Sequence, residues 1–284
     1  MDLAYWGFRR WPFERSFAAD RFFASPLHDE ALARLLFLVE EGRRSGVLVG
    51  AARTGKSFLL KLLKDRSERL ARLVVRCEAN GIDGQELALQ IAQGCHVSVD
   101  IDSSSGRIWQ GLQARFSALS LIQQSMVVLI DHFDQADVRC LGTISRLHQL
   151  ADSMGVRLTV ILATRNRAIP AALMADTELR IDLEPWTESE CTQFVHHAMN
   201  QAGSPNLVFT DEAIAAVHVE TGGVPGDAVT LCHLSLLVAR ARDEKLVISE
   251  DVLAASSELR PRASETAAKP RLVIERPFAM SAGS

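Results

Sequence analysis

Several features that would assign a chain to a special class are scarce in this sequence. The formal net charge is only −4 over 284 residues, with a pI near 6.1, so no excess of positive charge favours a non-specific grip on nucleic acid. The longest apolar runs, residues 126–130 among them, are far too short to cross a bilayer, and the N-terminus has no basic segment followed by an apolar core. No internal repeat is visible. We therefore expect neither secretory export nor a membrane span.

Cysteine motifs are also missing. The chain has five cysteines, an odd number, and they lie far apart without any Cys-x-x-Cys pair. They are Cys77, Cys95, Cys140, Cys191 and Cys232. This pattern predicts reduced cysteines in the core of a cytoplasmic protein. With 48% hydrophobic and 23% charged residues, the chain can form a large core and a smaller second domain.

The most informative stretch is residues 46–64, GVLVGAARTGKSFLLKLLK, in which a short apolar strand leads into GAARTGKS and then into an apolar-periodic helix. It matches the G-x-x-x-x-G-K-[ST] pattern, whose glycines let backbone N–H groups converge on the phosphates of a nucleotide at a helix N-terminus. Lys56 is expected to reach the β- and γ-phosphates, and the Ser57 hydroxyl to bind Mg²⁺. The candidate nucleotide-binding residues are Gly50, Ala51, Ala52, Arg53, Thr54, Gly55, Lys56, Ser57 and Phe58.

Strand-like and helix-like segments alternate after this loop. Four further strands are predicted at residues 73–77, 126–131, 158–163 and 179–183, and apolar residues recur at helical spacing in the connecting segments. The first three of these strands carry unbroken apolar runs, as strands covered on both faces do. The pattern predicts an α/β fold with a parallel sheet and right-handed crossovers.

The rest of the chain differs in character. We expect an aromatic N-terminal segment over residues 1–27 that packs on the outside of the nucleotide-binding core, which is favoured over a dedicated partner surface. The nucleotide-binding domain is predicted to span residues 28–184. Only helices are expected over residues 185–258, and residues 259–284 lose periodicity and indicate a flexible tail, with a short docking segment at residues 272–274 as the alternative.

The predicted strand at residues 126–131, MVVLID, carries a second chemical signal. It would present Asp131 at its C-terminal edge beside the phosphate loop, where the carboxylate can hold the Mg²⁺ water shell opposite Ser57. Asp134 follows closely and is a further candidate for positioning water. The alternative for Asp131 is an aspartate that starts a turn after a core strand.

With both motifs in place, the chain resembles the AAA+ ATPases, and within them the ExeA-type ATPases of bacterial secretion and pilus biogenesis together with their TniB-like transposition relatives. The resemblance covers roughly residues 4–258. It depends on YWGF and WPF near the start, His28, GAARTGKS, MVVLID, ILATR, LRIDLEPWTESE and TGGVPG, which fall in the family's order.

The resemblance implies a five-stranded nucleotide domain with a helical lid, ATP and Mg²⁺ as ligands, and assembly into a homo-oligomer. By position, Thr164 would be the sensor that contacts the attacking water or the γ-phosphate. Arg180 would be a candidate finger for a neighbour's site, and a surface arginine is the alternative.

Two residues depart from the family's pattern. His132 follows Asp131 where members usually carry a glutamate that polarises water, and Gly226 follows Pro225 where they usually carry an arginine. We therefore expect ATP binding with slow hydrolysis, coupled to remodelling or assembly of a complex with an unidentified protein partner. The alternatives are a nucleotide-gated interaction module and a DNA-transposition-type regulator. The basic residues that would serve DNA are interleaved with Asp65 and Glu68, which disfavours nucleic acid as a partner.

Overall fold

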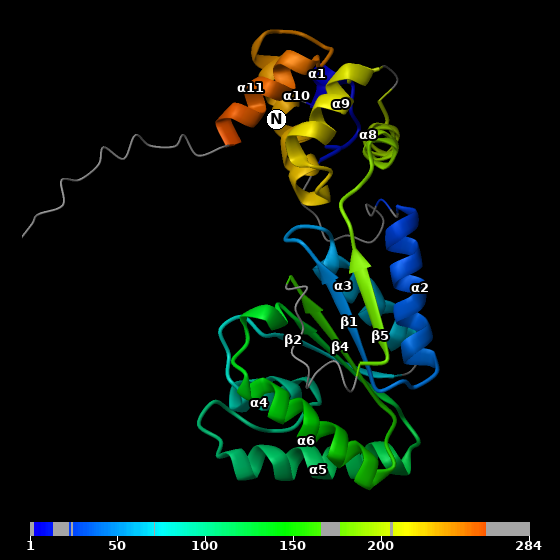
Figure 1. The fold of residues 1–284 in the computed structure, drawn as a ribbon, viewed down its shortest axis with the longest axis vertical. Helices are drawn as coiled ribbons and strands as arrows, with labels where there is room; N and C mark the ends of the chain where they lie inside the picture. The colour runs from blue at the N-terminus through cyan, green and yellow to red at the C-terminus, as the bar shows by residue number, and fades with distance from the viewer. Residues whose placement is uncertain are drawn as a thin grey trace, which may run out of the picture.

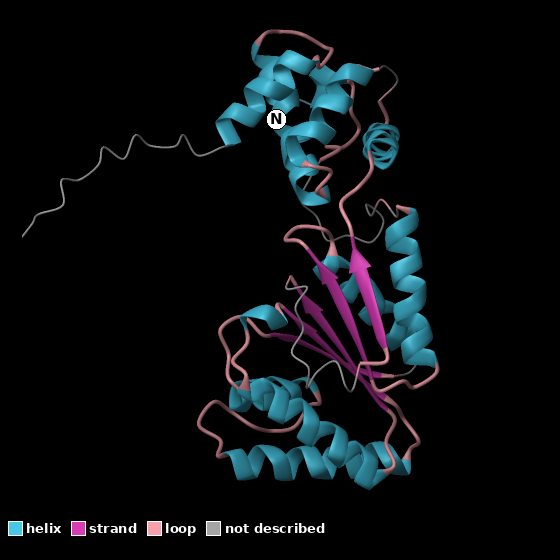
Figure 2. Cartoon of the chain, in the orientation of Figure 1, coloured by secondary structure: helices cyan, strands magenta, loops and turns pink. Residues whose placement is uncertain are grey.

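A computed structural model describes residues 3–13, 23, 25–70, 72–165, 177–204 and 207–259. The predicted tail, residues 259–284, therefore lies almost entirely outside the described residues. So do parts of the N-terminal segment. The boundaries between the predicted domains stay predictions, although the two parts are easily seen as a mixed α/β half and a helical half (Figure 2).

The described strands form one parallel five-stranded sheet in the order β2-β3-β4-β1-β5. The strands are β1 (Ser45–Gly50), β2 (Leu73–Glu78), β3 (Met126–Asp131), β4 (Leu158–Thr164) and β5 (Leu179–Leu183). Each coincides within a few residues with a predicted strand. The predicted fold class, a parallel P-loop sheet followed by a helical domain, is confirmed.

Helices cover both faces of this sheet (Figure 1). One face packs against α2 (Pro26–Glu40) and α3 (Lys56–Arg69), and the other against α4 (Gly84–Gly94), α5 (Ser105–Leu121) and α6 (Arg139–Met154). Side chains alternate along each strand: Leu48 faces α2 and α3, whereas Val47 and Val49 face the other layer. Because both faces are buried, the strands had to be apolar throughout, which explains their unbroken runs.

The sheet also determines where the functional residues lie. All strands are parallel, so their carboxyl ends meet at one edge, and ligands of such sheets bind beyond that edge. The loop after β1 and the residue at the end of β3 both lie there. The 3₁₀ turn η2 (Phe133–Gln135) follows β3 at the same edge.

The helical lid domain consists of α8 (Glu188–Ala202), α9 (Asp211–Thr221), α10 (Pro225–Ala241) and α11 (Ser249–Leu259). Thr187 caps α8 and forms a capping box with Glu190. In the chain from residue 185 onward, the described secondary structure is helical apart from an isolated bridge between Phe209 and Val247.

The N-terminal aromatics correct one prediction. Trp6, in the short helix α1 (Leu3–Trp6), is buried with Phe8 and Phe13 in the core of the helical lid domain, not against the nucleotide-binding core. The Phe13 ring lies 5.9 Å from that of Phe194 in α8. A domain of four described helices has a small interior, and these rings supply apolar surface that its own helices lack.

The buried cysteines confirm a simpler prediction. All five cysteines are buried and free. Among the described residues, no helix combines the length and the apolar composition that a membrane span requires.

Candidate phosphate-binding site

The loop between β1 and α3 has the backbone that a phosphate cradle requires. Gly55 caps α3 at a φ of 98°, a left-handed conformation that disfavours side chains. At Gly50, a Cβ would lie 2.8 Å from Thr54 Oγ1 and 2.9 Å from the Leu183 carbonyl oxygen, so only glycine fits. The Thr54 hydroxyl donates to the carbonyl of Ala51 at 3.0 Å and closes the turn. Ala51, Ala52 and Arg53 are exposed at its tip.

Lys56 lies at the first position of α3 and is only 8% exposed. Its Nζ donates to the carbonyls of Gly50 at 2.8 Å and Ala51 at 2.6 Å, so the ammonium group is held inside the loop. Burial lowers the pKa of Lys56, and the negative charges of Asp131 and Asp134 oppose that shift. Ser57 and Phe58 follow in the first turn of α3, where both are half-buried.

His28 supports this loop from behind, a role that the sequence did not reveal. It is 1% exposed in the first turn of α2, and its Nε2–H donates to the carbonyl of Thr54 at 2.9 Å. Its Nδ1 accepts from the Ser25 hydroxyl at 2.8 Å, which fixes the neutral tautomer. Burial lowers the pKa of His28, although the Thr54 carbonyl, Glu190 and Asp29 act in the opposite direction. A Cβ at Gly55 would meet the ring at 2.8 Å.

Asp131 ends β3 at the same edge of the sheet and is 1% exposed. Its Oδ2 accepts from Arg76 Nη2 at 3.1 Å, and Arg76 also bonds Glu78 Oε1 at 2.9 Å. Glu78 ends β2 and stands directly opposite Asp131 in the strand register. The arginine thus joins two carboxylates on neighbouring strand ends.

His132 begins the turn after β3 with a φ of 56°, in the left-handed region. Its Nδ1–H donates to Glu78 Oε2 at 3.0 Å. In the neutral ring with this donor, Nε2 is the nitrogen that accepts hydrogen bonds. The sequence placed no carboxylate beside His132, and the structure places Glu78 there. The available signal was that Glu78 directly follows the predicted second strand, as His132 follows the predicted third.

Asp134 and Thr164 lie on the β4 side of the same edge. The Asp134 carboxylate accepts from the backbone N–H of Arg165 at 3.0 Å and from its Nε at 2.8 Å. Burial raises the pKa of Asp134, but the hydrogen bonds and the positive charge of Arg165 lower it by more. The pKa of Asp134 therefore lies below its usual value. Asp134 is therefore engaged as an ion-pair partner. Thr164 ends β4 and is 6% exposed.

Arg180 lies elsewhere. It stands opposite Val47 in the pairing of β5 with β1, three residues before Leu183 pairs with Gly50. Three residues of strand span about 10 Å, which separates Arg180 from its own phosphate loop. Its guanidinium bonds the Asp182 carboxylate at 2.8 and 2.9 Å on the same strand.

The donors for a metal can be tested against the residues present. Ser57 offers a hydroxyl and Asp131 a carboxylate, the hard oxygen ligands that Mg²⁺ prefers. Glu78, Asp131 and His132 also offer ligand atoms within 4.8 Å of one another. Arg76 already supplies a cation between the two carboxylates of that group, so a metal fits better on the Ser57 side of Asp131.

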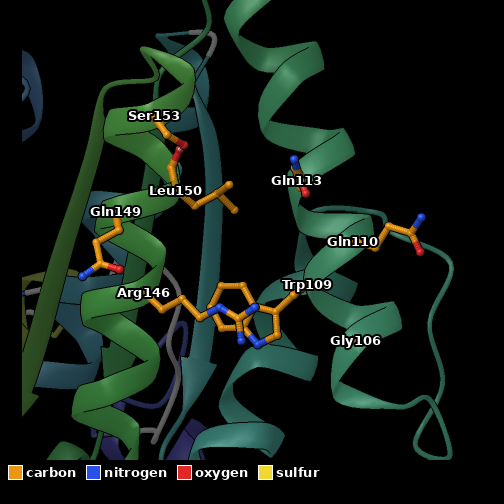
Figure 3. Close-up of a pocket in the computed structure, with 8 residues that line it drawn as sticks. All are labelled: Gly106, Trp109, Gln110, Gln113, Arg146, Gln149, Leu150 and Ser153. Atoms are coloured by element: carbon orange, nitrogen blue, oxygen red, sulfur yellow. The ribbon is translucent and has the colours of Figure 1, made fainter.

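A second hollow lies far from this edge. A groove of about 420 Å³ runs between α5 and α6, where the guanidinium of Arg146 stacks 4.0 Å above the ring of Trp109 (Figure 3). Gln110, Gln113 and Gln149 line it as well. These helices lie at the opposite end of the molecule from the helical lid domain, so the groove is separate from the phosphate loop (Figure 1).

Comparison with known proteins agrees with this geometry. Residues 39–169 match the family described as AAA domain. The chain is 21% identical over 266 residues to general secretion pathway protein A of Aeromonas hydrophila, and the match covers 91% of this chain and 48% of that protein. The chain thus spans about half the length of this relative.

Solved structures show the same fold. Cdc6p of Pyrobaculum aerophilum superposes with a TM-score of 0.70 at 18% identity, covering 87% of this chain and 70% of that one. Orc1 of Aeropyrum pernix in complex with DNA has a TM-score of 0.66 at 19% identity, covering 89% and 70%. The RuvB branch migration motor of Thermotoga maritima has a TM-score of 0.58 at 16% identity, covering 87% and 73%. The match to the AAA domain and the similarity to general secretion pathway protein A support an AAA+ ATPase of the ExeA type, and the solved structures show the same fold.

Proposed function

We propose that the chain binds Mg-ATP at the loop between β1 and α3 and hydrolyses it slowly, using the cycle to remodel or assemble a protein complex. The observation that carries this proposal is the joint geometry of Lys56 and Asp131. Lys56 is held inside a glycine-built loop, and the buried carboxylate of Asp131 lies close enough to affect the pKa of Lys56. A cation site and a metal-binding carboxylate on one sheet edge are what phosphoryl transfer requires.

Each residue then has a definite task. The N–H groups of the loop and the N-terminus of α3 would receive the phosphate oxygens, and Lys56 would exchange its carbonyl partners for the β- and γ-phosphates. Ser57 and Asp131 would hold Mg²⁺, which neutralises developing charge on the phosphates when it is bound. Thr164 at the end of β4 would contact the attacking water.

The slow rate is inferred from the groups that remain to activate that water. Asp134 is bonded to Arg165, and His132 stands where a glutamate is usual. Loss of a positioned base typically costs about 10²–10⁴ in rate. A second candidate function follows from the same observation: a nucleotide-gated interaction module, in which ATP orders the lid and an oligomer interface while turnover serves only as a timer.

Remodelling of a complex is proposed by analogy with the secretion protein, because fold alone does not define a pathway. We also propose assembly into a homo-oligomer. DNA remains a less favoured partner, although Orc1 in the structure above is bound to DNA. A gel shift over a salt series, with and without ATP, separates a DNA-bound regulator from the other two functions.

Lys56→Ala tests the proposed function. We expect the wild type to show a thermal shift with Mg-ATP, and Lys56→Ala to lose up to about 100-fold in affinity, since charge-assisted bonds to phosphate contribute up to about 3 kcal/mol. Lys64→Ala is the matched control, because Lys64 lies on the same helix and pairs with Glu68 at 2.6 Å. Without nucleotide, all three proteins should unfold cooperatively. No shift in the wild type, or equal shifts in both variants, would refute nucleotide binding at this loop.

A further inference from the structure

Arg53 joins the phosphate loop to the helical lid domain. It has a φ of 65°, an uncommon conformation for a residue with a Cβ. Its Nη2 bonds the carbonyl of Gly226, and also Thr230 Oγ1 at 2.5 Å. Its Nη1 lies 2.9 Å from Asp227 Oδ1. One exposed side chain of the loop therefore has three partners in the first two turns of α10.

The backbone adds a fourth contact. The N–H of Gly226 donates to the carbonyl of Arg53 at 3.0 Å. A Cβ on Gly226 would lie 2.9 Å from Arg53 Cβ and 3.1 Å from its carbonyl oxygen, so a side chain there would force the two segments apart. Glycine at position 226 is thus the residue that permits this close approach.

The conformation and the contacts explain each other. A left-handed turn at a non-glycine residue persists only where surrounding contacts over-determine it, and such outliers gather at functional sites. The contacts of Arg53 described above are all made with residues of α10. Arg53 also belongs to the loop whose N–H groups would receive the phosphate oxygens in the proposed function.

We propose that Arg53, Gly226, Asp227 and Thr230 form a latch that holds the phosphate loop in its binding conformation and makes nucleotide affinity depend on the position of the lid. This inference rests on the proposed function. With the latch closed, the loop is preorganised, and little ordering cost remains when phosphates bind. With the lid displaced, Arg53 loses the contacts that maintain its left-handed turn. By linkage, bound nucleotide then favours the docked lid.

The latch is suited to opening. The Arg53 and Asp227 side chains are 42% and 43% exposed, and an ion pair between exposed groups is weak and screened by salt. A partner that displaces α10 could therefore lower nucleotide affinity without touching the phosphates. Asp227 is a positioning residue in this scheme, because it acts only through Arg53.

A double-mutant cycle tests the latch. Mg-ATP affinity is measured by calorimetry for the wild type, Asp227→Asn, Arg53→Gly and the double variant. Glycine adopts the left-handed turn without support, so Arg53→Gly removes the need for the latch as well as the latch itself. We expect Asp227→Asn to weaken binding about 3- to 10-fold in the wild-type background and by less than 1.5-fold in the Arg53→Gly background.

The matched control is Asp243→Asn. It breaks an exposed pair with Arg240 at 2.9 Å near the other end of α10, far along the helix from the loop. This variant should bind Mg-ATP as the wild type does. The latch is refuted if Asp227→Asn matches Asp243→Asn, or if Asp227→Asn weakens binding equally in both backgrounds, as a merely structural role would.

A second measurement separates failure of the latch from failure of the proposed function. Hydrogen exchange without nucleotide should become at least threefold faster in residues 224–232 of both Asp227→Asn and Arg53→Gly, and not in Asp243→Asn. If the wild type binds no Mg-ATP but exchange accelerates, the proposed function fails and the latch stands as a contact between domains. Unchanged exchange in both variants overturns the latch even if ATP binds.

Discussion

The two sides of the candidate nucleotide site differ in how they are built. On the β1 side, a continuous segment supplies the phosphate loop, with Gly50, Gly55 and Lys56 in fixed positions along seven residues. On the β2–β3 side, the chemistry depends on partners brought together by the sheet, such as Glu78 with His132 and Arg76 with Asp131. The β1 side matches the family's sequence pattern, whereas the β2–β3 side departs from that pattern at His132.

This difference separates binding from turnover. In the proposed function, the glycines and Lys56 form the phosphate cradle, whereas the residue after Asp131 is a histidine whose Nδ1–H is already bonded to a carboxylate. His132 thus forms a hydrogen-bonded pair with Glu78 where the family usually carries a single glutamate. We therefore expect the second side to control the rate, and its substitutions to change turnover more than affinity.

The largest effect is expected from His132→Glu. A carboxylate at this position restores the usual water-orienting group, and we expect steady-state phosphate release to rise at least about tenfold, or roughly 1.4 kcal/mol in barrier height. The new carboxylate would lie beside Glu78, and two adjacent like charges disfavour ionisation of both. The double variant His132→Glu with Glu78→Gln should therefore release phosphate faster than His132→Glu alone.

Two controls sharpen this comparison. His132→Ala and Asp134→Asn should leave Mg-ATP affinity within about threefold of the wild type, because neither residue is needed for the phosphate cradle. Wild-type turnover at ordinary motor rates, together with an inactive His132→Ala, would mean that the Glu78–His132 pair is an effective base. The same rate with an inactive Asp134→Asn would assign that role to Asp134.

Much of the fold could be predicted from the sequence because local patterns and burial agreed. The strand MVVLID is apolar throughout since β3 is covered on both faces, and its boundaries match the prediction. Docking of the N-terminal aromatics could not be predicted in the same way. Hydrophobic rings indicate burial but not against which domain, and Trp6, Phe8 and Phe13 are nearly two hundred residues from their partners in the sequence.

The candidate site divides along the same line. The phosphate loop is a local motif, so its residues could be named from the sequence. The pairing of Glu78 with His132 requires the register of β2 against β3, and the contact of Arg53 with α10 requires the docking of the lid. Gly226 illustrates the limit: its departure from the family pattern suggested a lost function, whereas the structure shows a close backbone contact with Arg53.

A smaller effect is expected from His28→Gln, on the β1 side. Glutamine can keep the bond to the Thr54 carbonyl but not also the bond that Nδ1 accepts from Ser25, so the variant should lose about 1 kcal/mol of stability at pH 7.5. Glutamine also cannot titrate. Burial lowers the pKa of His28, so the unfolded chain binds a proton more readily than the folded one. The stability contributed by the neutral ring is present above pH 6.5 and declines as the pH falls below that value. Chemical denaturation between pH 7.5 and 5 should show the gap between variant and wild type narrowing.

A gap that stays constant over this pH range would mean that His28 does not remain neutral. A gap that widens on acidification would mean that the carboxylates of Asp29 and Glu190 stabilise the imidazolium more than burial disfavours it. Either result would mean that a neutral His28 does not support the phosphate loop. The order of the β1 side of the site would then have to come from the glycines of the loop alone.

The smallest effect is expected from Arg180→Ala. Its guanidinium bonds Asp182 on the same edge strand, and a partly exposed pair of this kind contributes about 0–1 kcal/mol to stability. A finger that reaches a neighbour's γ-phosphate contributes about 10³–10⁵ in rate, so the two roles differ far beyond experimental error.

Because β5 already supplies Asp182 as a partner, we expect turnover of Arg180→Ala to stay within about threefold of the wild type at protein concentrations that favour assembly. Asp182→Asn breaks the pair with Arg180 without removing the guanidinium, and it should likewise change little. A loss of a hundredfold or more in Arg180→Ala, with Asp182→Asn unchanged or faster, would instead show that a neighbouring copy uses Arg180. The catalytic side of the site would then extend across a subunit interface, whereas the phosphate loop would remain complete within one chain.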